Sequence, residues 1–138
     1  MTIGAAQRRL VRERAGACCE YCRLAEHDRL SSFHVDHIIP VKHGGTDHSA
    51  NLCLACYKCN GYKGANVAGL DSETGAATKL YHPRLQHWDD HFEWKPDGMI
   101  IGLTPEGRTT STVLRMNDTS RVQHREALLE LGSYPCQK

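Results

Sequence analysis

The sequence predicts an α+β fold in two parts: a cysteine-rich strand–strand–helix unit over about residues 17–66, and a hairpin with helices over about residues 67–138. Three observations support this division. Paired cysteines stand on both sides of a β-rich stretch. That stretch stops at Pro40, which cannot continue a central strand, and a Pro-Asp-Gly turn at residues 96–98 joins two apolar runs. A chain of 138 residues suits one domain, so we expect residues 1–138 to fold together.

The composition is that of a folded globular protein. Hydrophobic residues make up 40% of the chain and charged residues 24%. The net charge is +1, but residues 1–66 carry nine Lys/Arg against six Asp/Glu, and residues 67–138 carry eight against ten. A surface for an anionic partner is therefore expected in the first half. No stretch approaches the ~20 consecutive apolar residues that cross a bilayer, and the N-terminus lacks the apolar core of a secretory signal. We therefore expect a cytoplasmic protein without a membrane span.

The first half predicts a helix, two strands and a second helix. Residues 4–17 form a short basic helix. Residues 33–39 are rich in β-formers, and residues 51–54 are a second strand candidate. The Gly-Gly pair and the Thr, Asp and Ser content of residues 41–50 indicate a loop between the strands. Residues 57–66 then predict a helix.

The second half predicts an irregular connector, a hairpin and two helices. The connector is the Gly/Ala/Thr-rich stretch 67–78. Asp-Gly supplies the turn of a hairpin over residues 92–101. A threonine cap followed by proline begins a helix over about residues 104–116, and a further helix runs over 118–131. Around the charged run 89–91, we expect Trp88, Phe92 and Trp94 to pack inward while the charges face water.

Two Cys-x-x-Cys pairs predict a structural zinc site. Two residues between thiolates let one turn direct both sulfurs at a single tetrahedral ion, and a second such turn completes four ligands at about 2.3 Å. Because sulfur then fills every position, the site leaves none open for chemistry. The predicted ligands of one Zn²⁺ per chain are Cys19, Cys22, Cys56 and Cys59.

The remaining cysteines allow other pairings. Cys53 also stands three residues before Cys56, and Cys18 adjoins the first pair. We leave Cys53 out because it lies in an apolar strand, where a buried thiol packs as a small hydrophobe. Cys136 stands alone, and an odd count of seven cysteines favours metal binding over a disulfide framework. Neither a Cys₂His₂ finger nor a zinc deaminase fits the observed spacing and motifs.

An Asp-His dipeptide and two asparagines in the first half suggest phosphodiester cleavage. Histidine ordinarily titrates near pH ~6.5, so His37 suits a general base that takes a proton from water. Asp36 and Asn60 supply hard oxygen ligands for Mg²⁺ or Mn²⁺, and the Asn51 amide can hold the imidazole by a hydrogen bond. Adjacent strand residues point to opposite faces, so Asp36 and His37 share a site only where the strand ends or bulges. The alternative is an interior histidine beside a loop-capping carboxylate.

These residues resemble the HNH endonuclease family. The runs Cys-Glu-Tyr-Cys, Val-Asp-His-Ile-Ile-Pro, Lys-His-Gly-Gly and Asn-Leu-Cys-Leu-Ala-Cys-Tyr-Lys-Cys-Asn-Gly-Tyr-Lys-Gly look like its ββα-metal finger. The first His of the motif would be His37, the middle Asn would be Asn51, and the last position is Asn60, the HNN form. The resemblance, to small standalone bacterial members, extends over nearly all 138 residues. In the second half it implies a shared fold and no named role.

The resemblance implies metal-dependent hydrolysis of DNA, with weak sequence preference and with 3′-hydroxyl and 5′-phosphate products. It places the scissile phosphate over the helix that begins near Tyr57 and makes Lys63 a phosphate contact. Arg84, beside Pro83, is a second candidate contact. The main rival is a zinc-knuckle module that binds nucleic acid without cleaving it, which needs the cysteines but not the Asp-His pair or the asparagines.

Overall fold

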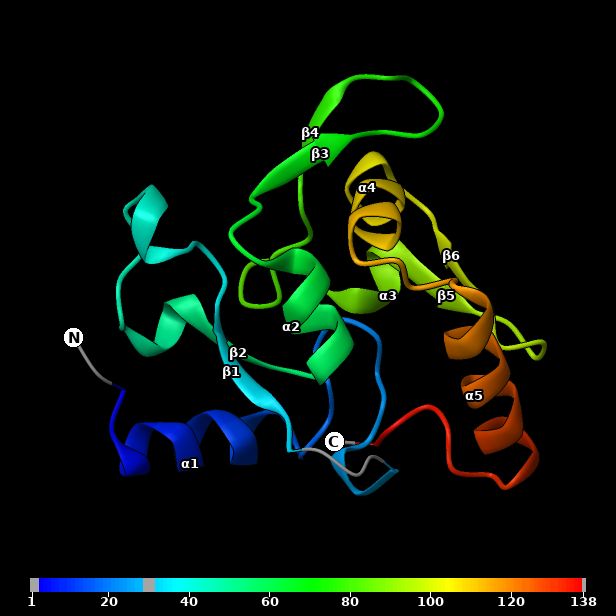
Figure 1. Ribbon diagram of the computed structural model, residues 1–138, viewed down its shortest axis with the longest axis horizontal. Helices are drawn as coiled ribbons and strands as arrows, with labels where there is room; N and C mark the ends of the chain where they lie inside the picture. Colours follow the sequence, from blue (N-terminus) through cyan, green and yellow to red (C-terminus); the bar gives the residue numbers. More distant parts are fainter. Residues whose placement is uncertain (1–2, 29–31, 138) are drawn as a thin grey trace.

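The first half of the molecule has the predicted order of helix, strand, strand and helix. The structure is a computed structural model that describes residues 3–28 and 32–137. Helices α1 and α2 both contact the strand pair formed by β1 and β2, and Figure 1 shows the two helices on different sides of that pair. The bounds are α1 (Ala5–Arg14), β1 (His34–His37), β2 (Leu52–Ala55) and α2 (Tyr57–Lys63).

Strands β1 and β2 pair antiparallel and bring the predicted site to their open end. Asp36 lies opposite Cys53, and His37 lies opposite Leu52. Every position of β2 is buried, whereas β1 keeps one face partly open to solvent. β1 ends at His37, which meets the condition for neighbouring strand residues to reach one site. Two 3₁₀ turns, Val41–His43 and Ser49–Asn51, shape the connection to β2.

Helix α2 begins immediately after β2 and is capped by a cysteine. The Cys56 sulfur accepts a hydrogen bond from the backbone N–H of Cys59 at 3.4 Å, the position in which an N-cap side chain satisfies a free donor. The helix ends at Lys63, and Gly64 follows with a φ of 50°, a left-handed value that glycine adopts without strain. A helix of seven residues thus carries Cys59, Asn60 and Lys63.

The second half consists of two hairpins and three helices. The β5–β6 hairpin, α4 and α5 agree with the prediction, and the Thr104 hydroxyl caps α4 by accepting the Gly107 N–H at 3.1 Å. Of the helices in residues 3–28 and 32–137, none combines the length and apolar character needed to cross a membrane. The bounds are β3 (Ala68–Leu70), β4 (Ala77–Lys79), α3 (Trp88–His91), β5 (Phe92–Trp94), β6 (Ile100–Gly102), α4 (Pro105–Val113) and α5 (Thr119–Glu130).

The stretch predicted as an irregular connector instead forms the β3–β4 hairpin. Asp71, at the turn, accepts a hydrogen bond from the Thr74 hydroxyl at 2.8 Å. Its carboxylate also accepts two bonds from the Arg108 guanidinium, at 2.8 and 3.0 Å, which hold the pKa of Asp71 well below its usual range. Arg108 belongs to α4. The contact that anchors the hairpin is therefore tertiary, and the local sequence does not reveal it.

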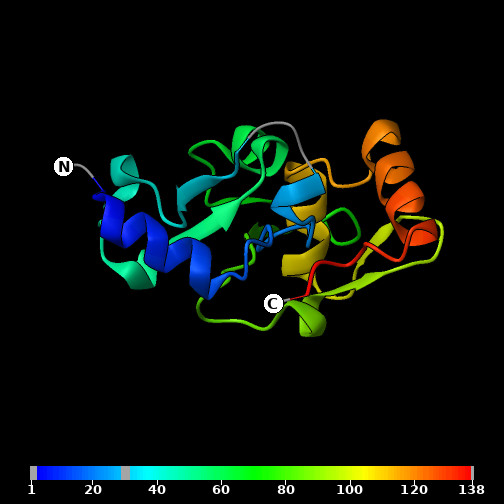
Figure 2. The same ribbon diagram turned by 90° about the horizontal axis from the view of Figure 1, so that it is seen from below.

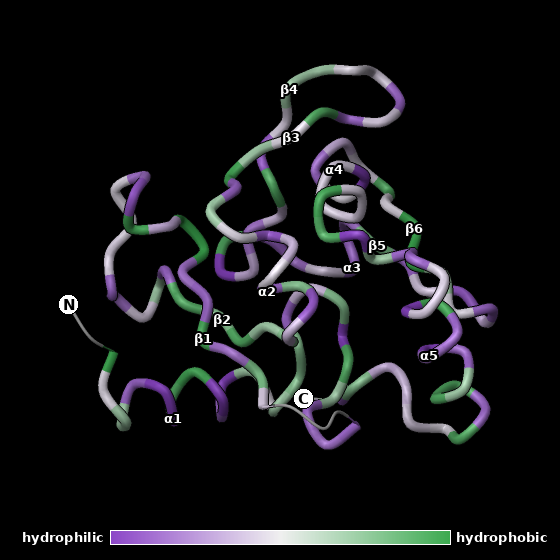
Figure 3. The backbone as a smooth tube through the Cα atoms, in the orientation of Figure 1, coloured by the Kyte–Doolittle hydropathy of each residue, from purple (hydrophilic) through white to green (hydrophobic). Residues whose placement is uncertain are grey.

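A shared set of buried side chains joins the two halves. The apolar cluster includes Val11 and Leu52 from the first half and Phe92 and Leu114 from the second. Figure 3 shows hydrophobic stretches of chain at both β2 and β6. Trp88 packs inward as predicted and is buried. Trp94 departs from the prediction, because 37% of it is exposed at the hairpin surface.

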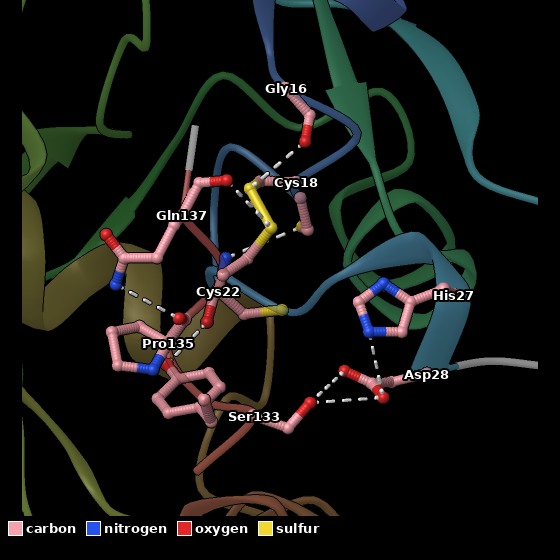
Figure 4. The surroundings of a disulfide bond; sticks show 11 residues. Gly16, Cys18, Cys22, His27, Asp28, Ser133, Pro135 and Gln137 are labelled. Atoms are coloured by element: carbon pink, nitrogen blue, oxygen red, sulfur yellow. Dashed lines mark hydrogen bonds and ion pairs between the residues drawn. A yellow bond between two sulfur atoms is a disulfide. The ribbon is translucent and has the colours of Figure 1, made fainter.

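A disulfide links the C-terminal tail to Cys18, which adjoins the first cysteine pair. Cys18 and Cys136 are bonded, with their Cα atoms 5.7 Å apart (Figure 4), and Figure 2 shows the C-terminal segment passing beside this region. The expectation that Cys136 stands alone is therefore wrong, and the cysteine pattern that argued against a disulfide framework did not reveal this bond. The two residues are 118 positions apart, so no local spacing indicates their pairing. They meet because the tail folds back, with the Cys136 N–H donating to the Arg23 carbonyl at 2.8 Å.

Candidate metal centre and active site

Four buried cysteines form a compact cluster between the first knuckle and the start of α2. Their sulfurs all lie within 4.8 Å of one another, and Cys22 and Cys56 are 3.7 Å apart. Sulfurs around a tetrahedral ion with bonds of about 2.3 Å are separated by about 3.8 Å. The cluster therefore has the donor type and the spacing of a zinc site. Its members are Cys19, Cys22, Cys56 and Cys59.

The protonation of these thiols depends on their burial and on one another. Burial raises the pKa of Cys19 and of Cys59 well above the usual value. Hydrogen bonds within the cluster lower the pKa of Cys22 and Cys56. A divalent ion supplies the positive charge that four buried thiolates require.

Cys53 lies outside this cluster. It is fully buried in β2, and its thiol donates weakly to the Tyr21 hydroxyl at 3.5 Å. Burial raises the pKa of the Cys53 thiol far above its ordinary value, so it remains a neutral packing group. The structure thus separates Cys53 from the four clustered sulfurs, and the disulfide removes Cys18 in the same way.

His37 is oriented by a carboxylate that the sequence analysis did not identify. Its Nε2 lies 2.7 Å from Asp47 Oδ1, and 26% of the His37 side chain is exposed. Because a carboxylate accepts hydrogen bonds, a hydrogen on Nε2 satisfies this contact, and a neutral imidazole in that tautomer has its lone pair on Nδ1. Asp47 follows Gly44-Gly45-Thr46 in the loop between the strands. The sequence signal for this contact was an aspartate in the loop that follows the candidate base.

Asn51 holds the loop and not the imidazole. Its side-chain oxygen accepts the Ile39 N–H at 2.9 Å, and its amide donates to the Ile39 and Thr46 carbonyls at 2.9 and 2.8 Å. The expected hydrogen bond from Asn51 to His37 is replaced by these three bonds to backbone. Asn51 therefore acts on the site indirectly, because it anchors the residue immediately before Asp47.

Asp36 is a buried carboxylate with a cation already beside it. Lys63 Nζ lies 3.1 Å from its Oδ2, and the Tyr21 hydroxyl donates to the same oxygen at 3.0 Å. Burial raises the pKa of Asp36, and the Lys63 ammonium opposes that rise. The ammonium also donates to the His37 carbonyl at 3.0 Å. The last residue of α2 thereby fixes the end of β1.

Both predicted phosphate contacts are engaged in ion pairs within the protein. Lys63 is only 1% exposed, because its ammonium is used by Asp36. Arg84 is paired with the buried carboxylate of Glu20, and burial lowers the pKa of the Arg84 guanidinium to about 10. Both residues serve internal ion pairs. Their role as DNA phosphate contacts stays a prediction, and in this arrangement of the chain both cations already have carboxylate partners.

One open pocket brings together three of the four predicted catalytic residues, all but Asn51. It has a volume of about 230 Å³ and is lined by Asp36, His37 and Asn60, with Pro40 and Gly64 among its other walls. The pocket thus joins the end of β1 to the middle of α2. A small polar recess with an imidazole, a carboxylate and an amide can bind a cation and a phosphate oxygen together.

The fold and the clustered cysteines define a mixed helix-and-strand protein with a candidate metal-binding centre. Residues 19–66 match the family model of the HNH endonuclease, so this part of the chain is similar to that family. The matched stretch contains all four clustered cysteines and the pocket residues Asp36, His37 and Asn60. Comparison with curated proteins found no match, and comparison with solved structures found none either.

Proposed function

We propose that this protein is a metal-dependent DNA endonuclease whose ββα-metal finger consists of β1, β2 and α2. The observation that carries the proposal is the pairing of His37 with Asp47 at the pocket that Asp36 and Asn60 also line. A histidine with a purely structural role would not need to line an open pocket together with residues that offer oxygen ligands. The HNH match over the same residues supports the same class of reaction.

In the proposed reaction His37 is the general base. Its Nε2–H donates to Asp47, so Nδ1 takes the proton from a water molecule. The resulting hydroxide attacks phosphorus in line with the departing 3′ oxygen, and the products carry 3′-hydroxyl and 5′-phosphate ends. Asp47 keeps the ring in the tautomer and orientation that this transfer requires. Asn51 keeps the preceding loop residue in place.

Asp36 and Asn60 fit the ligand set of a hard divalent cation. Both offer oxygen donors of the type that Mg²⁺ or Mn²⁺ binds, and both line the pocket beside His37. The cation would supply positive charge against the charge that develops on the phosphate. Lys63 now neutralises Asp36, so Asp36 would bind the cation in competition with that ammonium.

The second metal in this proposal is one Zn²⁺ bound by the four clustered cysteines. For contact with DNA, we propose the exposed Lys42 in place of Lys63 and Arg84, which are engaged in ion pairs within the protein. Lys42 adjoins Val41, which lines the pocket, and the first half carries the positive charge excess. Contacts of this kind recognise phosphate and not bases, which agrees with weak sequence preference.

Incubation of supercoiled plasmid with the purified protein tests the proposal. We expect nicked or linear DNA with Mg²⁺ or Mn²⁺, and none when a chelator removes the loosely held cation while the thiolate-bound zinc remains. The products should be substrates for a ligase, which needs a 5′-phosphate beside a 3′-hydroxyl. If DNA is bound but remains intact with every divalent cation tested, the chain is the non-catalytic binding module.

A second prediction concerns the carboxylate that orients the base. Asp47→Asn should lower kcat by about 10- to 100-fold with little change in KM, because misorientation of a catalytic group costs rate without loss of substrate contacts. Initial nicking rates over a range of DNA concentrations give both constants. Asp90→Asn, at an exposed position on α3, is the matched control. A rate for Asp47→Asn equal to that of the control would exclude an orienting role.

A further inference from the structure

Two arginines of α5 are buried although neither is paired with a carboxylate in the contacts that the structure describes. Arg121 is 7% exposed and Arg125 is 2% exposed. They are four residues apart on the helix and therefore lie on the same face. Their hydrogen-bond acceptors are backbone carbonyls, one amide oxygen and sulfur. A guanidinium does not lose its charge, so a negative group other than a carboxylate must compensate the burial.

Arg121 reaches the cysteine cluster directly. Its Nη2 donates to Cys59 Sγ at 3.0 Å and lies 3.8 Å from Cys56 Sγ. Its Nη1 donates to the carbonyls of Leu114 and Arg115, just after α4, at 2.6 and 3.2 Å. One side chain therefore connects the cluster, α5 and the end of α4.

Arg125 extends the same connection away from the cluster. Its Nε donates to the Gly98 carbonyl at 2.7 Å, in the turn of the β5–β6 hairpin. Its Nη2 donates to the Met116 carbonyl at 2.5 Å. The two arginines thus hold α5 against both the metal centre and the remainder of the second half. Figure 1 shows α5 at the lower right, below α4 and the β5–β6 hairpin.

The charges of the two groups balance when the cluster holds a divalent ion. Four thiolates around one divalent cation carry two negative charges, and two guanidiniums carry two positive charges. The recess of about 90 Å³ beside the cluster is lined by no acidic residue among those described. Its charged or titratable lining groups other than the cysteines are Lys58, Arg121, His124 and Arg125.

We propose that Arg121 is a hydrogen-bond donor to the metal-bound sulfurs and that, with Arg125, it couples metal binding to the docking of α5. This inference rests on the proposed zinc site. Donors to metal ligands stabilise the anionic form of the ligand, and their loss typically lowers metal affinity by about 10- to 100-fold. Conversely, loss of the ion frees the sulfurs that Arg121 contacts to move apart, which weakens the attachment of α5 to the cluster.

The first experiment compares Arg121→Met with Arg9→Met. Both remove one arginine and keep an unbranched side chain, but Arg9 is exposed on α1. Transfer of zinc to a chromogenic chelator should be about 10- to 100-fold faster for Arg121→Met than for the parent, and unchanged for Arg9→Met. Arg121→Lys retains the charge and should lie between the parent and Arg121→Met. In the cobalt-substituted protein, loss of the N–H···S bond should move the sulfur-to-cobalt charge-transfer band to lower energy.

The second experiment uses the parent chain and needs no variant to fold. Hydrogen exchange with and without bound metal should show that the amides of α5 lose protection together with those of α2 when the ion is removed. Protection retained in α5 while α2 exchanges would overturn the coupling. Zinc transfer and a cobalt spectrum unaltered by Arg121→Met would overturn the role of Arg121. A parent chain that binds no metal at all would instead refute the zinc site itself.

Discussion

Replacement of His37 by alanine is expected to slow plasmid nicking by roughly 10²- to 10⁴-fold. The imidazole is the only group at the pocket that we assign to proton transfer from water, and its Nδ1 has no substitute there. The folded structure should persist, because a quarter of the side chain is exposed (26%) and its hydrogen bond is to the loop residue Asp47. Initial nicking rates at a fixed cation concentration measure the effect.

The control for this variant is its affinity for DNA. Binding depends on cationic contacts to phosphate, which His37 does not provide, so gel-shift affinity at the same salt concentration should match that of the parent. Zinc content and thermal midpoint should also be unchanged. Equal nicking by His37→Ala and parent would remove His37 as the base, and a parallel loss of DNA binding would indicate a structural role.

The second large effect is expected from the cysteine cluster. Cys56→Ser should abolish zinc binding and unfold the first half, because structural zinc contributes on the order of 10 kcal/mol to such small sites. Cys56 is both a member of the cluster and the cap of α2, so its loss removes a ligand and a helix start together. Metal analysis of protein purified without chelator, with circular dichroism, measures both consequences.

Cys53→Ser is the matched control for that experiment. Cys53 is equally buried and belongs to the same strand–helix segment, but it lies outside the cluster. It should keep one zinc per chain and a folded first half. Zinc loss in Cys53→Ser with retention in Cys56→Ser would reverse our choice of cysteine pair.

The two sites are linked through α2, so loss of zinc should also remove catalysis. Cys56 caps the helix, Asn60 lines the pocket from its middle, and Lys63 binds Asp36 from its last residue. A helix of only seven residues has little stability of its own. Its position is therefore held by the sulfurs at one end and by the buried ion pair at the other.

The ion pair at the end of α2 also explains why lysine occupies that position. A carboxylate buried as deeply as Asp36 requires a compensating charge. Lys63 supplies it and, through the His37 carbonyl, also restrains the backbone of the proposed base. The same lysine is thus a structural element of the pocket and not a contact at its mouth.

The sequence by itself determined the elements whose signals are local. Cys-x-x-Cys spacing, the β-rich run before Pro40, the Asp-Gly turn and the Thr-Pro helix start are all local signals of a few residues, and each has its counterpart in the structure. The pocket residues Asp36, His37 and Asn60 were also identified, because residue type restricts the chemistry that a side chain can perform.

Only the tertiary structure decided the contacts between distant segments. The β3–β4 hairpin depends on Arg108 of α4, the disulfide joins residues 118 positions apart, and α5 delivers Arg121 to sulfurs of α2. The tertiary structure also shows that Lys63 lies in the interior, paired with Asp36, and that the side-chain partner of His37 is Asp47. The physical reason is common to all of them: a charged or hydrogen-bonding side chain can satisfy several partners, and only the folded chain determines which partner comes within reach.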